Sequence, residues 1–243
     1  MSKQESALAG KNVVVIGGTS GIGLATVIAA SELGANVWAA GRSAEHIEKA
    51  RAATGGKVTI VAVDTHDEEG LTALFSQIGQ IDHLVSAATG ANRTLKPFVQ
   101  QTGEQFKEAF GKLWGYASVV RIGAPFMAKD GSITLVSGAP ARKIKPNMSA
   151  LSCVGGAVEN LVRALAVEMA PIRVNVVAPG IIDTALFDWM GAEKAERVAA
   201  MTKGQLVERI GKPQEVASAL IYLMQNGYAT GTTVDVDGGQ LLR

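Results

Sequence analysis

The sequence is poor in cysteine, in aromatic residues and in net charge. Its 243 residues include one cysteine, Cys153, and only 5% of them are aromatic. A single cysteine forms no internal disulfide, which is typical of a reducing compartment, so we expect a cytoplasmic protein. Cys153 lies in an apolar stretch with helical spacing, where packing is a more common role than nucleophilic chemistry. A net charge of +1 without a basic block argues against nucleic acid as a main partner.

Long apolar segments are missing as well. Residues 1–10 are polar and contain no apolar core of the secretory kind. No run of about 18 apolar residues occurs, so we expect no membrane span. The chain is nevertheless 47% hydrophobic, which is enough for a large core. Because no repeat, linker or low-complexity segment interrupts it, we expect residues 1–243 to form one domain, and we predict no metal site.

Glycine is abundant, and the most informative glycines follow the first apolar run. The β-branched residues 13–16 predict a buried strand, and Gly17-x-x-x-Gly21-x-Gly23 connects it to a helical pattern. Glycine permits positive φ and close approach of the backbone to a ligand. A strand, a glycine turn and a helix start leave N–H groups at the positive end of a helix dipole, which is typical of a diphosphate site. The spacing differs from G-x-G-x-x-G, and the alternative is a tight turn without a ligand.

The second predicted strand, residues 36–40, is followed by a cation where dinucleotide folds often place an acid. An acid there would hold a ribose 2′-hydroxyl, but Arg42 and Ser43 offer a guanidinium and a hydroxyl. Both suit a 2′-phosphate, and one charge-assisted contact contributes about 1.5–3 kcal/mol. We therefore predict NADP(H) as the cofactor. The alternative is that Arg42 is a solvated loop charge and Ser43 the N-cap of the next helix.

Strand and helix patterns alternate along the rest of the chain. Strands are expected at 13–16, 36–40, 57–63, 81–87, 131–137, 172–177 and 232–236, and helices at 43–53, 102–129, 149–170 and 213–225. This alternation predicts a doubly wound α/β fold with a parallel sheet.

Several strand ends carry residues suited to a ligand. Asp64, followed by Thr65, closes the third strand and is placed to accept from an adenine amino group or to cap the next helix. The small residues at 86–90 would let the backbone pass close to a cofactor before a loop at 91–101. After the sixth strand, a mixed segment at about 184–204 carries Phe187, Trp189 and Met190, which look exposed. We expect this segment to act as a lid over the ligand crevice and to favour an apolar substrate.

Taken in order, these features resemble the short-chain dehydrogenase/reductase family over essentially the whole chain. The matching motifs are Gly17-x-x-x-Gly21-Ile22-Gly23, Asp64, Pro179-Gly180 with Thr184, and Val236-Asp237-Gly238-Gly239. The resemblance implies a single Rossmann-like domain, a seven-stranded parallel sheet with helices on both faces, a nicotinamide cofactor and a homodimer or homotetramer. By position it implies contacts of Thr19, Ser20 and Ile22 with the diphosphate, Asp64 with adenine, Ala87 and Ala88 near the ribose, and Ile182 and Thr184 on the carboxamide and phosphate side.

The catalytic pattern of that family is only partly present. The family uses a Ser after strand five, Tyr-x-x-x-Lys on the next helix and an Asn on the helix before. Ser137 fits the serine position, although a turn cap is an equally plausible role. The Tyr and Lys positions hold Leu151 and Gly155 or, in the other register, Ala150 and Val154. The three tyrosines are Tyr116, Tyr222 and Tyr228, and no lysine lies between Lys145 and Lys194.

Lys112 stands at the family's Asn position and is our candidate for a substitute acid. A positioned general acid contributes about 10²–10⁴-fold, and a desolvated ammonium can have a suitably lowered pKa. The alternative is a surface lysine on an amphipathic helix, and Lys143 and Lys145 are weaker candidates. We predict an NADP(H)-dependent oxidoreductase that uses Ser137 and Lys112 to reduce a small apolar carbonyl or quinone-like acceptor. The alternative is an NADP(H)-binding sensor protein whose catalysis has lapsed.

Overall fold

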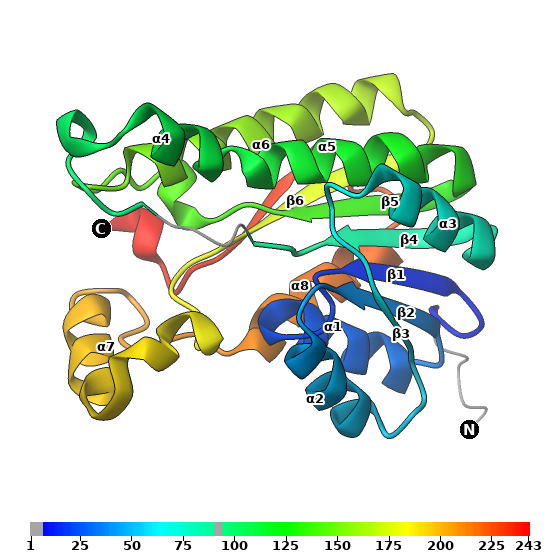
Figure 1. Ribbon diagram of the computed structural model, residues 1–243, viewed down its shortest axis with the longest axis horizontal. Coiled ribbons are helices and arrows are strands. Elements are labelled where there is room, and N and C mark those ends of the chain that lie inside the picture. Colours follow the sequence, from blue (N-terminus) through cyan, green and yellow to red (C-terminus); the bar gives the residue numbers. More distant parts are fainter. Residues whose placement is uncertain (1–6, 90–93) are drawn as a thin grey trace.

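The computed structural model describes residues 7–89 and 94–243 (Figure 1). Parts of the polar N-terminus, of the small-residue segment at 86–90 and of the loop expected at 91–101 lie outside the described residues. Seven strands form one sheet in the order β3-β2-β1-β4-β5-β6-β7. All neighbouring strands are parallel, which confirms the predicted sheet. The strands are β1 Asn12–Ile16, β2 Asn36–Gly41, β3 Thr59–Ala62, β4 Ile81–Ser86, β5 Met127–Val136, β6 Arg173–Pro179 and β7 Thr233–Val236.

Helices cover both faces of the sheet (Figure 1). Alternate residues of β1 enter opposite core clusters, Val13 and Val15 on one face and Val14 and Ile16 on the other. This period of two is expected for a strand that is buried on both sides. One face is covered by α1 Gly21–Glu32, α2 Ala44–Thr54 and α8 Pro213–Gln225, and the other by α3 Glu68–Ile78, α5 Gly111–Gly123 and α6 Ser149–Glu168.

The strand order reverses at β1, which lies between β2 and β4. At such a switch point the connections leave the sheet on opposite faces, and a crevice forms at the carboxyl ends of the strands. The topology therefore places the turn after β1, the end of β4 and the end of β5 around one opening.

The helix expected at 102–129 is wrong in extent. Thr102 caps a short helix, α4 Gly103–Ala109, through a capping box with Gln105, and α5 follows after Phe110. Pro125 lies in a short 3₁₀ turn, because proline is poorly tolerated inside an α-helix, and β5 already begins at Met127.

The helix α6 differs from expectation in two respects. By length and composition alone it could cross a membrane, although a buried core helix passes the same test. Here it packs against the sheet through Val158 and Val162. Cys153 is exposed, so the predicted packing role is wrong, because this residue lies on a face of α6 that points away from the core.

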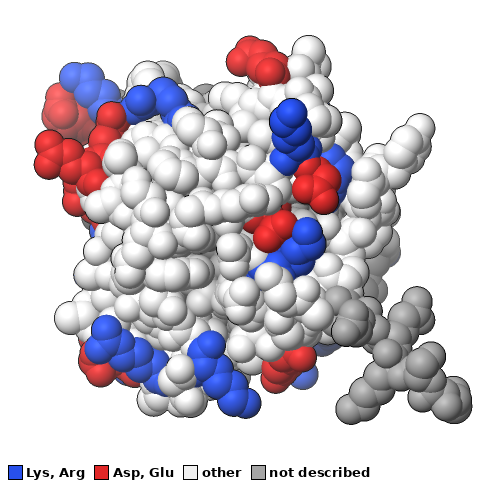
Figure 2. Space-filling model, turned by 90° about the vertical axis from the view of Figure 1, so that its right-hand side faces the viewer, with Lys and Arg blue, Asp and Glu red and all other residues white. Residues whose placement is uncertain are grey.

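The expected lid segment forms η4 Ala185–Glu193 and α7 Lys194–Thr202, beside the carboxyl end of the sheet (Figure 1). Trp189 is 70% exposed, but Met190 is buried, contrary to expectation. Gly191 has φ of 52° and kinks the chain within η4. On the face in Figure 2, acidic and basic side chains lie close together and most of the surface is uncharged.

Candidate functional site

A cavity of about 910 Å³ opens at the carboxyl ends of the strands. Its size is within the roughly 300–1,000 Å³ that is usual for small-molecule sites. Lys112 and Ser137 line it together with every predicted cofactor-binding residue except Asp64. Those residues are Gly17, Thr19, Ser20, Gly21, Ile22, Gly23, Arg42, Ser43, Thr65, Ala87, Ala88, Pro179, Ile182 and Thr184. Their predicted roles stay predictions, but the structure brings them to one opening.

The glycine turn requires glycine at two positions. Gly17 has φ of 80°, and a Cβ atom there would lie 2.5 Å from the backbone nitrogen of Ala88. A Cβ atom at Gly23 would overlap the carbonyl oxygen of Gly17. Ser20 begins α1 in an extended conformation without a side-chain cap, and the first turn contains no acid. The first turn of α1 thus brings no carboxylate of its own to the positive end of the helix dipole, which suits an anionic ligand.

Thr184 supplies a second indication of a ligand. Its Oγ1 is buried and has no hydrogen-bond partner within residues 7–89 and 94–243. A buried hydroxyl in that state costs about 1–3 kcal/mol, and a polar ligand group in the cavity would satisfy it. The residues present therefore fit a dinucleotide, since the glycine turn suits an anionic group and Thr184 suits a polar group.

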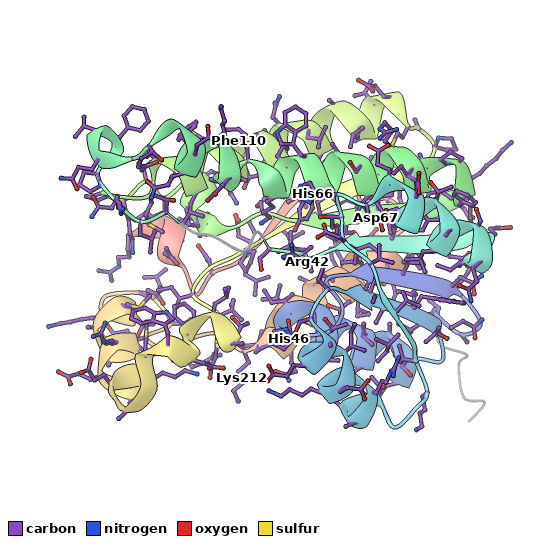
Figure 3. The ribbon with its side chains drawn as sticks, in the orientation of Figure 1. Arg42, His46, His66, Asp67, Phe110 and Lys212 are labelled. Atoms are coloured by element: carbon purple, nitrogen blue, oxygen red, sulfur yellow. The ribbon has the colours of Figure 1, made fainter. Side chains whose placement is uncertain are left out.

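The β2 end of the cavity is rich in cationic and imidazole groups. Arg42, His46 and His66 all line it, and in Figure 3 Arg42 lies between the two histidines. Ser43 accepts a hydrogen bond of 3.3 Å from the backbone N–H of His46, so it does cap α2. A contact of Ser43 with a cofactor stays a prediction. Sequence reasoning missed both histidines, because neither belongs to a motif.

Asp64 lies outside the cavity lining. Its Oδ2 is 3.3 Å from Arg42 Nη1, and its Oδ1 accepts a bond of 2.9 Å from the backbone N–H of His66. Burial alone would raise the pKa of Asp64, but hydrogen bonds from His66 and the Arg42 ion pair together hold it below the ordinary value. The carboxylate thus positions Arg42, and a contact with adenine stays a prediction.

Lys112 and Ser137 meet at the end of β5. Lys112 Nζ donates to the backbone oxygen of Ser137 at 3.1 Å and lies 5.3 Å from the ring centroid of Tyr116. The Tyr116 hydroxyl donates to Val136 O at 3.1 Å, and the residue is buried. The ammonium is thus part of the cavity wall, whereas Lys143 and Lys145 do not line the cavity.

A buried acid lies directly behind Ser137. Ser137 Oγ donates to Glu159 Oε1 at 3.2 Å, and Glu159 is only 3% exposed on α6. Arg142 Nε lies 3.2 Å from Glu159 and its guanidinium also pairs with Asp235 of β7. The hydrogen bonds to Asp235 raise the pKa of Arg142. Sequence reasoning missed Glu159, although an acid within an apolar helical face was a usable signal.

At the positions that align with the family's Tyr-x-x-x-Lys, this chain has Leu151 and Gly155. A Cβ atom at Gly155 would lie 2.9 Å from the Cβ of Ala141, which belongs to the turn η3 Ala139–Ala141. The chain after β5 thus packs directly on α6 at that point. Leu151 is partly buried and does not line the cavity.

Comparisons with known proteins agree with this architecture. A family model described as Enoyl-(Acyl carrier protein) reductase matches residues 16–240. A short-chain dehydrogenase/reductase of Stachybotrys chlorohalonatus is 34% identical, with 96% of this chain and 98% of that protein aligned. The reductase/Diels-Alderase MalC of Malbranchea aurantiaca has a TM-score of 0.89 at 32% identity, covering 98% of this chain and 99% of its own. An NADPH-bound short chain oxidoreductase of Pseudomonas aeruginosa with an atypical catalytic center has a TM-score of 0.87 at 29% identity, covering 94% and 96%.

Proposed function

This chain belongs to the short-chain dehydrogenase/reductase family, and we propose that it is an NADP(H)-dependent reductase with a rebuilt reaction site. Its substrate would be a small apolar carbonyl or a quinone-like acceptor. The observation that carries the proposal is that Lys112 and Ser137 line the same cavity as the predicted dinucleotide-binding residues.

The choice of NADP(H) rests on the β2 end of the cavity. Arg42 and His46 line it where an acid would favour NAD(H), and a similar structure from Pseudomonas aeruginosa binds NADPH. The Asp64 ion pair holds the Arg42 guanidinium without burying it, since the Arg42 side chain is 52% exposed. We expect a tenfold to hundredfold preference for NADPH, roughly the value of one charge-assisted contact.

The proposed reaction site lacks the family's Tyr and Lys and replaces their acid function with Lys112. The glycine turn and Arg42 would hold NADPH, which would supply a hydride to the acceptor. The Lys112 ammonium gives the proton that the reduced oxygen takes up, and solvent then restores it. Tyr116 is poorly placed for this role, because its hydroxyl already donates to Val136. A Pseudomonas aeruginosa relative also contains an atypical catalytic center, so the fold accommodates one.

The kind of acceptor that we propose follows from Lys112, a weaker acid than the family's Tyr and Lys together, and from the lid segment. Quinones and α-dicarbonyls are activated acceptors that need less acid assistance than simple ketones. Leu186 and Phe187 of the lid segment line the cavity and present apolar surface to a substrate. We therefore expect activated acceptors with an apolar side to react fastest.

Two measurements test this proposal together. Fluorescence titration compares NADPH with NADH, and an oxidation screen then offers α-dicarbonyls, quinones and simple ketones to the NADPH-loaded protein. We expect tighter binding of NADPH and its oxidation by activated acceptors. Tight NADPH binding without oxidation by any acceptor would contradict the reductase and favour the lapsed, sensor-like protein.

A further inference from the structure

The buried Glu159 determines which way the Ser137 hydroxyl points. An ionised carboxylate in an apolar core is unfavourable unless it is paired, and here Arg142 pairs with it at 3.2 Å. A carboxylate in an ion pair accepts hydrogen bonds and donates none. Ser137 must therefore donate its only hydroxyl proton to Glu159, across 3.2 Å. The lone pairs of Ser137 Oγ are what this residue can offer to the cavity.

Lys112 presents the opposite kind of group a short distance away. An ammonium has donors and no acceptor, and Lys112 Nζ lies 3.1 Å from the backbone oxygen of this same Ser137. The reaction end of the cavity thus combines a donor at Lys112 with an acceptor at Ser137. A simple ketone can use only the donor, since its oxygen accepts and cannot donate.

We propose that the cavity selects α-hydroxycarbonyl compounds, in which a hydroxyl stands on the carbon next to the carbonyl. The carbonyl oxygen accepts from Lys112, and the neighbouring hydroxyl donates to Ser137 Oγ. Glu159 is the positioning residue, because it holds the Ser137 proton away from the substrate. This inference rests on the proposed reductase activity and adds α-hydroxycarbonyl compounds to the carbonyl substrates that the cavity would bind.

A dead-end complex tests the inference without turnover. The ligand pair is 3-hydroxy-3-methylbutan-2-one, a tertiary α-hydroxyketone, and 3,3-dimethylbutan-2-one, in which a methyl group replaces the hydroxyl. Neither reacts with NADP⁺, because a tertiary alcohol cannot be oxidised to a ketone and a ketone takes up hydride only from the reduced cofactor. Calorimetry on the NADP⁺-loaded protein should show about 3- to 10-fold tighter binding of the hydroxyketone, the usual effect of one hydrogen bond.

Three variants locate the cause of that preference. In Glu159→Gln the amide can donate to Ser137, whose own proton then turns to the cavity. Because 3-methoxy-3-methylbutan-2-one has an ether oxygen that accepts and cannot donate, it should bind this variant more tightly than the wild type. Ser137→Ala removes the side-chain acceptor, should abolish the preference for the hydroxyketone and provides the test if Glu159→Gln fails to fold. Glu168→Gln, an exposed acid on the same helix, is the matched control and should keep the full preference. The thermal midpoint and NADP⁺ affinity of each variant report its integrity.

The outcomes separate this inference from the proposed function. Equal affinities for the two ketones in the wild type, no binding of either, or a preference that survives Ser137→Ala would overturn the inference. None of these results bears on NADPH oxidation in the acceptor screen. Failure of that screen would refute the reductase while leaving the hydroxyketone preference measurable.

Discussion

The proposed diphosphate end and the proposed reaction end of the cavity are built from different parts of the chain. At the proposed diphosphate end the site is formed by backbone atoms, which leave no room for a Cβ atom at Gly17 or Gly23. At the reaction end, side chains from three separate elements meet, namely Lys112 of α5, Ser137 after β5 and Glu159 of α6. A backbone site changes only if the fold changes. A side-chain site can be rebuilt by a few substitutions on an unchanged fold.

The largest effect is expected from Gly23→Ala. The new Cβ would overlap Gly17 O, so the turn must open and the diphosphate site is lost. We expect NADPH affinity to fall at least about a thousandfold, or ~4 kcal/mol, in a fluorescence titration. Gly156→Ala on α6 is the control, because a Cβ there meets nothing within 4 Å. Unchanged NADPH affinity in Gly23→Ala would refute the backbone site.

Arg42→Ala tests the side-chain contribution within the cofactor end. NADPH affinity should drop roughly tenfold to hundredfold while NADH affinity stays constant. Loss of the ion pair should also move the pKa of Asp64 upward, because Arg42 is one of the groups that lower it. Arg51→Ala on the exposed side of α2 should change neither affinity. An equal loss for both cofactors would show that Arg42 does not read the 2′-phosphate.

His83 does not line the cavity, so its effect on the stability of the fold can be measured apart from cofactor binding. Burial lowers its pKa from 6.5 to about 4, and its Nδ1 lies 2.8 Å from Ser132 Oγ. Between these values the unfolded chain binds a proton that the folded protein does not, so stability falls as the pH falls. From pH 7 to pH 5 this amounts to about 2 kcal/mol.

Urea unfolding at the two pH values measures that loss. His83→Gln should lose about 2 kcal/mol less than the wild type over the same interval. Its NADPH affinity should be unchanged, because His83 lies on β4 outside the cofactor cavity. An identical pH dependence in both proteins would contradict the assignment.

The smallest effect on turnover is expected where the family's Tyr and Lys are introduced at their aligned positions. Leu151→Tyr with Gly155→Lys should not raise turnover, since the Cβ at position 155 already meets Ala141 at 2.9 Å. Crowding there should lower the free energy of unfolding by about 1–3 kcal/mol. Gly156→Lys is the matched control and should leave stability nearly unchanged, because the site is open. A large gain in turnover would show that the cavity accommodates the family's Tyr and Lys at these positions.

Strands, helix starts and the glycine turn could be predicted, because they depend on the local sequence pattern. The continuous β-branched run of β1 and Pro213 at the start of α8 predicted elements that the structure confirms, and the glycine spacing predicted a turn that lines the cavity. The long helix at 102–129 was wrong, because amphipathic spacing continues through Phe110 and hides the break there. The Ser137–Glu159–Arg142 cluster could not be derived, since its pairing depends on how η3 packs against α6.

In the proposed reaction Lys112 supplies the acid at the reaction end of the cavity. Single-turnover oxidation of bound NADPH by an α-dicarbonyl, in the wild type and in Lys112→Met, decides whether it does. We predict a rate about 10²–10⁴-fold lower in the variant, with NADPH affinity nearly unchanged and Lys143→Met at the wild-type rate. Equal rates in the wild type and Lys112→Met would contradict the claim.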